Sequence, residues 1–494
     1  MAHHRKVGYA HLRERLSTGA FEPSQPAKVY PVQKFVRLSD CVQVPEHAAP
    51  ASDASALEHL LFALKHEELD LQAAILALKK IDPVPLVEQF SQATSSSYLQ
   101  QACFLWEIAN QQTLNAPPAK GATKPLFDPN LFLTGPSSKY TRWRVDFNGI
   151  GSLQYSPTVR LTPEIKALLA EDILGQAREF IQSMDPDMVE RAVRWAYLSE
   201  TEGSYAIERE APTGNRTEAF AKLLARAHEE ILLTEEYLVE LQNLTVKSAM
   251  DQAVEYRNQQ NWLRRDSSIT YVPPAPEHLL PVMEGLLTLA NQKDNGIHPL
   301  VLGSLVSFGF VFAHPFMDGN GRLSRFLFHK IACRNANLPN GLVLPISTAM
   351  ARHEGHYLRA LKSFSAPARD LWTVAKVSDL EYDCAFEGSP EIYHFWDATQ
   401  CVQFGLEMAK EALQRDLHEE VHFLGRFDRV YSRLNKAIDM NNNLMNLIAR
   451  LLVQNDGALS ISKRKMFIAK GCTEELLNEA EQIAQEALNE ESPD

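Results

Sequence analysis

The sequence predicts a mainly α-helical protein: a helical core with a small β-hairpin beside it, flanked by helical regions. Two observations support this fold class. Apolar residues recur at helical spacing in most long segments, among them 57–80, 97–110 and 300–313. In contrast, the stretch 256–272 has aromatic and β-branched residues on both sides of a polar link, which is typical of a hairpin.

The composition agrees with a globular enzyme. The length of 494 residues suggests two to four domains, and the 45% hydrophobic content is enough for sizeable cores. A net charge of -13 argues against nucleic acid or an acidic membrane surface as the main partner. The 6 cysteines form no Cys-x-x-Cys pair, and the longest apolar run, 300–313, is too short to span a bilayer. We therefore expect reduced thiols, no membrane segment and a cytoplasmic location.

Changes in composition divide the chain into three regions. Residues 1–165 contain helical segments separated by Pro- and Gly-rich stretches, and no chemical motif shows their role. A core follows at 180–370, and a charged helical domain is expected at 380–494. The basic residues at 463–465 follow a turn there, which leaves a DNA-binding module as an alternative. The acidic end of the chain counts against DNA, so a supporting or target-recognising helical bundle is the better interpretation.

The segment 314–325 concentrates the chemistry. Pro315 disfavours helical geometry in the residue before it, so His314 should end the apolar helix and face a loop, where it can accept a hydroxyl proton. Asp318 offers one hard oxygen ligand, which suits Mg2+. Gly319 and Gly321 leave main-chain N-H groups open to a phosphate at the start of the next helix.

Two cations continue the same segment. Arg322 and Arg325 lie outside the apolar stripe of the following helix, and guanidinium groups bind phosphates well. That stripe consists of Leu323, Phe326, Leu327 and Ile331. Together, the base, the carboxylate, the glycine turn and the cations can hold a nucleoside triphosphate.

This segment resembles the signature of Fic domains, His-x-Phe-x-Asp/Glu-Gly-Asn-Gly-Arg-x-x-Arg, and every specified position is met. The resemblance implies transfer of a nucleoside monophosphate, usually AMP from ATP, to a Ser, Thr or Tyr hydroxyl of a protein. It assigns His314 as the base and Asp318 as the Mg2+ ligand, with Phe316 as a core anchor. The implied nucleotide-binding residues are Gly319, Asn320, Gly321, Arg322 and Arg325. Related kinases of the Doc type carry Lys at the position of Gly321, which makes a phosphotransferase less expected.

An upstream segment resembles the family's inhibitory motif, Ser/Thr-x-x-x-Glu-Gly/Asn. Ser204 and Glu208 match it and fall one helical turn apart. The resemblance implies that Glu208 pairs with Arg325, takes the cation that the γ-phosphate needs and holds ATP in an unproductive pose. Arg209 stands where the family usually has Gly or Asn, which leaves open how this helix ends. An ordinary solvated helix face is the alternative for this pair.

Two further regions resemble parts of the family's site. The hairpin expected from strands 256–263 and 269–272 is similar to the flap that takes the target segment by main-chain pairing. Its target-docking candidates are Trp262, Ile269, Thr270 and Tyr271. In 345–361, Tyr357 resembles a residue of the base pocket, although its helical spacing from Leu361 equally favours a core position.

Several alternatives stay open. The same site could remove AMP from a modified protein, with Glu208 positioning a water, or transfer another nucleotide. His418 and His422 fit a His-Glu-x-x-His zinc pattern, the mark of a metallopeptidase, but a solvated charged helix is the simpler interpretation. A silent Fic domain in a DNA-binding regulator is a third class. The expected partners are ATP, Mg2+ and a target protein, which could be the chain itself, and a homodimer is allowed.

Overall fold

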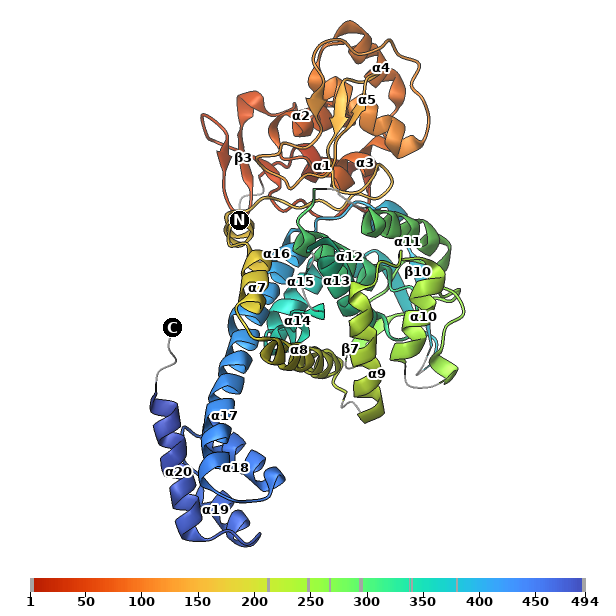
Figure 1. The fold of residues 1–494 in the computed structure, drawn as a ribbon. Coiled ribbons are helices and arrows are strands. Elements are labelled where there is room, and N and C mark those ends of the chain that lie inside the picture. Colours follow the sequence, from red (N-terminus) through yellow and green to blue (C-terminus); the bar gives the residue numbers. More distant parts are fainter. Residues whose placement is uncertain are drawn as a thin grey trace.

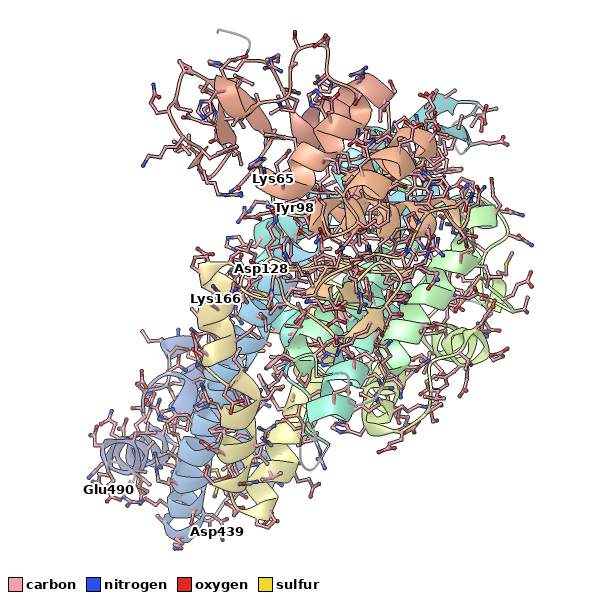
Figure 2. The ribbon with its side chains drawn as sticks, turned by 90° about the horizontal axis from the view of Figure 1, so that it is seen from above. Lys65, Tyr98, Asp128, Lys166, Asp439 and Glu490 are labelled. Carbon is pink, nitrogen blue, oxygen red and sulfur yellow. The ribbon has the colours of Figure 1, made fainter. Side chains whose placement is uncertain are left out.

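The computed structural model describes residues 4–210, 214–246, 249–265, 268–292, 296–336, 338, 341–378 and 381–490. Helices dominate, as the sequence predicts. Figure 1 shows the first five helices gathered at one end of the molecule, α17–α20 at the other and the remaining helices between them. In Figure 2, Lys65 and Tyr98 of the first part accordingly lie far from Asp439 and Glu490 of the last.

The first part combines helices with two small sheets. The predicted helix at 97–110 is confirmed, but that at 57–80 is two helices, because Asp70 caps a second one through its side chain. The sheets have the orders β1-β3-β2 and β4-β6-β5. The elements are α1 (Gly8–Leu16), β1 (Ala27–Tyr30), β2 (Val36–Arg37), β3 (Val42–Pro45), η1 (Glu46–Ala48), α2 (Ala56–His66), α3 (Leu71–Leu78), α4 (Pro83–Gln92), α5 (Ser97–Asn110), β4 (Lys124–Pro125), β5 (Ser138–Tyr140) and β6 (Val145–Phe147).

The middle part is built around α12, which is apolar and buried nearly all round and packs against α13 along its length. Its helices are α6 (Pro163–Ala170), α7 (Ile173–Gln182), α8 (Pro186–Ile207), α9 (Gly214–Ala225), η2 (Arg226–His228), α10 (Glu235–Thr245), η3 (Ala249–Asp251), α11 (Pro276–Asn291), α12 (Pro299–Ala313), α13 (Asn320–Ala336), α14 (Ile346–Arg352), α15 (Glu354–Arg369), η5 (Pro390–Tyr393) and α16 (Thr399–Glu411). Two antiparallel hairpins accompany them, β7 (Leu263–Arg265) with β8 (Ser268–Tyr271) and β9 (Trp372–Lys376) with β10 (Tyr382–Phe386).

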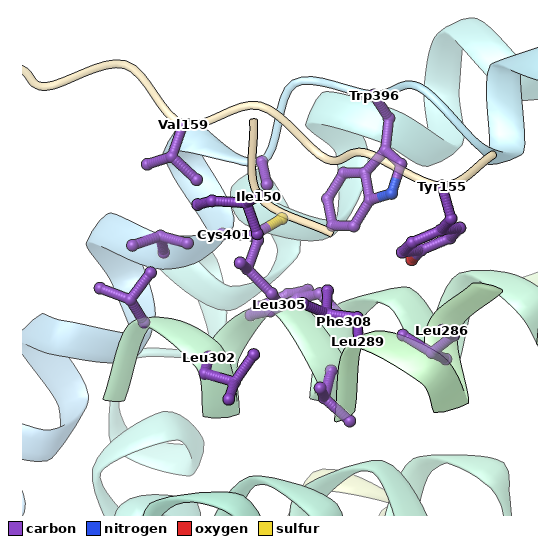
Figure 3. Close-up of a cluster of buried hydrophobic side chains, with 14 of the residues drawn as sticks. Ile150, Tyr155, Val159, Leu286, Leu289, Leu302, Leu305, Phe308, Trp396 and Cys401 are labelled. Carbon is purple, nitrogen blue, oxygen red and sulfur yellow. The ribbon is translucent and has the colours of Figure 1, made fainter. Parts of the chain in front are cut away.

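An extended segment joins the first part to this core. Figure 3 shows Ile150, Tyr155 and Val159 of that segment above Leu286 of α11 and Leu305 of α12. Backbone hydrogen bonds pair the segment with the chain around Trp396. A Cβ on Gly285 would lie 2.4 Å from Tyr155 Cβ, and one on Gly309 would lie 2.6 Å from its hydroxyl. The glycines therefore let this ring settle directly on both helices.

The last part has a hydrophobic core of its own. The π-helical segment Ala412–Leu417 joins α16 to α17 (His418–Ala437), and the two helices form one long rod in Figure 1. The helices α18 (Asn442–Gln454), α19 (Ile461–Ile468) and α20 (Glu474–Asn489) pack around the end of that rod. The ring of His418 stacks on Phe180 at 3.8 Å, and the described residues contain no group of three His, Cys, Asp or Glu that could hold a metal ion. No helix in the described part of the chain combines the length and apolar character needed to cross a membrane.

Candidate active site

His314 follows the last residue of α12 and adopts a left-handed backbone conformation, with φ 50°. The side chain is buried, and its Nδ1 lies 3.2 Å from the carbonyl oxygen of Val311. Because a carbonyl only accepts hydrogen bonds, Nδ1 must carry the proton, and the neutral ring keeps its lone pair on Nε2. Burial lowers the pKa of His314 to about 4. At neutral pH the ring is therefore uncharged and able to accept a proton.

The turn after His314 is fixed by the side chain of Asn320. Its amide oxygen accepts a hydrogen bond from the Phe316 N-H at 3.0 Å, and its amide nitrogen donates to the Phe316 carbonyl at 2.7 Å. Gly319 has φ 83°, a conformation that favours glycine. The Asp318 side chain is 45% exposed, and its Oδ1 accepts from the Gly319 N-H at 2.7 Å. The loop thus closes on itself while one carboxylate stays accessible.

Both arginines of the segment are buried on α13. Arg325 donates from Nε to Ser204 Oγ at 2.8 Å and from Nη2 to Glu208 Oε1 at 2.9 Å. Arg322 lies 3.6 Å from Asp318 and 3.6 Å from Glu210, and its guanidinium carbon sits 5.6 Å from the centre of the Tyr205 ring. The apolar stripe on α13 is buried as expected, but the helix is also covered on its polar side, where α8 supplies partners for the cations.

Glu208 stands at the end of α8, directly over the glycine turn. A Cβ on Gly321 would lie only 2.2 Å from Glu208 Oε1. The last residue of α8 is Ile207, and the chain turns away at Arg209, which has φ 56°; the N-H of Glu210 donates to the Tyr205 carbonyl at 3.0 Å. This Schellman-type end needs a left-handed residue, so Arg209 takes the conformation for which Gly or Asn is usually chosen. Its side chain pairs with Glu354 at 3.2 Å.

Sequence reasoning missed a second contact between the same two helices. Glu200 is fully buried on α8, and its Oε1 lies 2.9 Å from Nε2 of His329 on α13. Its other oxygen accepts from the main-chain N-H of Ser347 at 2.7 Å, and the Ser347 hydroxyl also donates to the carboxylate. The signal was present in the spacing, since Glu200 precedes Ser204 by four residues and His329 follows Arg325 by four.

The segment before the hairpin lies against the loop that follows α12 and contacts its main-chain carbonyl groups. The prediction of a strand at 256–263 is wrong, because β7 begins only at Leu263. Side chains from the residues before it form hydrogen bonds with the loop after α12. Arg257 donates to the His314 carbonyl at 2.9 Å, and Asn261 donates to the Phe316 carbonyl at 3.2 Å. The turn residues 266 and 267 lie outside the described residues.

The four docking candidates have different environments. Thr270 is exposed and Ile269 is half-buried on β8. Trp262 is half-buried and makes an edge contact with Tyr382, the rings 5.3 Å apart. Tyr271 is buried, and its hydroxyl donates to the Phe312 carbonyl at 2.6 Å. The side chain of Tyr271 therefore packs against the end of α12 and does not face outward.

Tyr357 packs in the core. Its ring stacks on Phe404, with centroids 5.6 Å apart, and also contacts Phe308. Burial raises the pKa of Tyr357; the nearby Arg325 lowers it, and Glu208 raises it. The hydroxyl end of Tyr357 is thus close to Arg325, while its ring belongs to the hydrophobic interior.

Comparison with known proteins matches one part of the chain to a known family. Residues 232–332 match the family model described as Fic/DOC family. A protein from Nematostella vectensis named "Protein adenylyltransferase Fic" is 26% identical over 219 residues, which are 38% of this chain and 50% of the relative. A Drosophila grimshawi protein of the same name is 37% identical over 65 residues, 13% of this chain and 14% of the relative. The alignments thus span half or less of these curated relatives.

Solved structures were also found. A Fic family protein from Desulfovibrio desulfuricans has a TM-score of 0.42 at 19% identity, covering 61% of this chain and 90% of that protein. A fragment of Fic-1 from C. elegans has a TM-score of 0.33 at 14% identity, covering 74% of this chain and 98% of that fragment. The family match contains His314 and all the motif residues up to Arg325, whereas Ser204 and Glu208 precede it. Residues 232–332 of this chain thus match the Fic/DOC family, and this matched segment contains the whole motif.

Proposed function

We propose that this chain is a protein adenylyltransferase that moves AMP from ATP to a Ser, Thr or Tyr hydroxyl of a protein. The observation that carries the proposal is the arrangement of 314–325, where a neutral imidazole and two buried guanidinium groups surround one glycine turn. An anion placed on that turn meets main-chain N-H groups and both cations. The relatives named protein adenylyltransferase support the choice of AMP over other nucleotides.

The chemistry follows from these positions. His314 Nε2 takes the proton of the target hydroxyl, and the hydroxyl oxygen attacks the α-phosphorus. The bond from the α-phosphorus to its bridging oxygen breaks, and pyrophosphate leaves with that electron pair. Arg322 and Arg325 bind the β- and γ-phosphates, where negative charge increases as the bond breaks. The enzyme's contribution is positioning and charge stabilisation, and no covalent intermediate on the protein is needed.

Asp318 fits a magnesium ion that arrives with ATP. One of its oxygens is used by the Gly319 N-H, and the half-exposed side chain leaves the other for a cation. A single carboxylate suits Mg2+ because that ion takes the rest of its shell from phosphates and water. When bound there, the ion neutralises charge on the α- and β-phosphates.

Glu208 is proposed as a built-in brake. Its carboxylate bonds to Arg325 and lies over Gly321, so it occupies both the cation and the space that the terminal phosphates require. Two negative groups at one place repel each other, and the triphosphate is then held away from the pose needed for in-line attack. Ser204 keeps Arg325 oriented towards the end of α8 through Nε.

The target is expected to enter beside the β7–β8 hairpin. Thr270 is exposed there and Trp262 is half-buried, so an extended segment of the target can pair with the strand and present its hydroxyl to His314. We propose a cytoplasmic protein as the target, with the chain itself as a second acceptor.

The reaction type is tested with two labels. Glu208→Gly protein and Mg2+ are incubated with ATP carrying the label at either the α- or the γ-phosphate, and protein-bound label is measured after denaturation. The proposal expects protein-bound label from the α-position alone. Label from the γ-position would mean phosphoryl transfer. Absence of label with ATP, GTP, UTP and CTP would instead favour removal of AMP, which is tested on an AMP-modified protein.

A further inference from the structure

Arg257 is a buried cation beside the catalytic loop, and it has neutral partners. Its side chain donates to the carbonyl oxygens of His314 at 2.9 Å, Gln259 at 3.1 Å and Pro274 at 2.5 Å. Burial lowers the pKa of Arg257 to about 10, and the groups that oppose this are the tyrosines 271 and 393 rather than a carboxylate. Burying a guanidinium on carbonyl groups is expensive, so a specific role is expected for it.

The contacts of Arg257 converge on the backbone of the proposed base. Its guanidinium holds the carbonyl of His314, and its own main-chain N-H donates to the carbonyl of Pro315 at 2.8 Å. These two peptide groups follow the residue whose φ of 50° is costly for a side chain with a Cβ. A strained conformation persists only where its surroundings hold it in place. At His314, Arg257 does so by binding the two successive carbonyls of His314 and Pro315.

We propose that Arg257 is a positioning residue for His314: it locks the two peptide groups after the left-handed turn and so fixes the imidazole relative to the Gly319–Gly321 phosphate turn. The inference rests on the proposed adenylyl transfer and deepens it. Arg257 does not touch the reacting atoms, because its hydrogen bonds all go to main-chain carbonyls.

The charge of Arg257 adds a second effect that can be measured separately. Burial is the main cause of the low pKa of His314; the positive charge of Arg257 lowers it further, while the Val311 carbonyl, Glu208 and Asp318 raise it. Losing the guanidinium therefore moves the pKa of His314 upward. Lysine keeps the charge but has a single nitrogen, so it cannot reproduce the three side-chain contacts.

The test compares Arg257→Gln and Arg257→Lys in the Glu208→Gly background. Two readouts are taken: kcat and KM for ATP from α-label transfer, and titration of His314 by NMR in protein with 13C-labelled histidine, assigned with His314→Ala. We expect both variants to lose kcat by about tenfold or more with KM for ATP changed by less than about threefold, because misplacement of the base affects the chemical step. We expect Arg257→Gln to raise the His314 midpoint and Arg257→Lys to leave it near that of the parent.

The outcomes separate the two proposals. An inactive Glu208→Gly parent contradicts adenylyl transfer, and the NMR titration still decides whether Arg257 acts on His314. Unchanged kcat in a folded Arg257→Lys protein, or an unchanged His314 midpoint in Arg257→Gln, overturns the inference. If Arg257→Gln does not fold by circular dichroism, the kcat of Arg257→Lys decides alone.

Discussion

Helix α8 binds α13 through two carboxylates that differ in their exposure. Glu200 is fully buried between His329 and Ser347, whereas the Glu208 side chain is 36% exposed at the helix end. A buried carboxylate that loses its partners finds no water, but an exposed one can exchange its partner for solvent at little cost. One helix can thus be held firmly at one turn and released two turns later. We infer that relief of the proposed brake moves the end of α8 and leaves its middle in place.

The largest expected effect is the loss of the buried anchor. Glu200→Gln removes the negative charge facing His329 and alters the contacts with Ser347, so we expect a stability loss of about 3 kcal/mol. Thermal denaturation followed by circular dichroism measures it as a lower midpoint. Glu202→Gln is the matched control, because Glu202 is exposed on the same helix and its change should leave the midpoint in place. Equal midpoints for the two variants would show that Glu200 does not stabilise the fold.

The next effect concerns activity. Glu208→Gly frees Arg325 for the triphosphate, and a charge-assisted hydrogen bond contributes about 1.5–3 kcal/mol, so transfer from ATP should rise about tenfold or more. Initial rates with α-labelled ATP give the number. Glu208→Gln, which keeps the size of the side chain over Gly321 but not its charge, should give an intermediate rate. A rate for Glu208→Gln equal to wild type would mean that bulk and not charge blocks the site.

A smaller effect is expected for stability at the releasable end. Glu208→Gln should cost less than about 1 kcal/mol, because the amide oxygen can still accept the hydrogen bond of the buried Arg325 and the substituted side chain is partly exposed to solvent. The same thermal measurement applies, with wild type and Glu200→Gln as the two reference points. A loss as large as that of Glu200→Gln would make both carboxylates anchors and would end the distinction between them.

The smallest expected effect concerns the pH profile of kcat/KM. Burial lowers the pKa of His314 to about 4, so the base stays neutral from pH 8 down to about 5 and is lost only as pH falls through the folded value. In Glu208→Gly, kcat/KM should therefore show no His314 inflection near pH 6.5. A profile measured between pH 4.5 and 8 in buffers of constant ionic strength checks this. An inflection near 6.5 would show an imidazole exposed to solvent in the working enzyme.

The sequence predicted the parts of this molecule that depend on local patterns. The helix at 97–110 and the apolar helix before His314 agree with the structure because their spacing and their end signals are contained in a short stretch. The ion pair of Glu208 with Arg325 was expected from the family resemblance alone, and the structure has these groups 2.9 Å apart. Arg209 ends the helix in a left-handed conformation, which its residue type does not predict.

What could not be predicted depends on contacts between distant segments. The stretch 256–262 has the composition of a strand, but Arg257 and Asn261 bind carbonyls about 55 residues away, and that interaction outweighs strand pairing. The role of Glu200 depends on His329 and Ser347, which lie more than a hundred residues away along the chain, so no local pattern predicts it. The small sheets of the first part have strands of two to four residues, too short for any periodic pattern.

The proposed reaction and its brake are tested together by label transfer from α-labelled ATP with Mg2+, comparing wild type, Glu208→Gly and Glu208→Gly/His314→Ala on a denaturing gel. We expect faint label with wild type, strong label with Glu208→Gly and loss of label when His314 is also changed. Equal label in wild type and Glu208→Gly would contradict the brake, and label that survives the loss of His314 would contradict its role as the base.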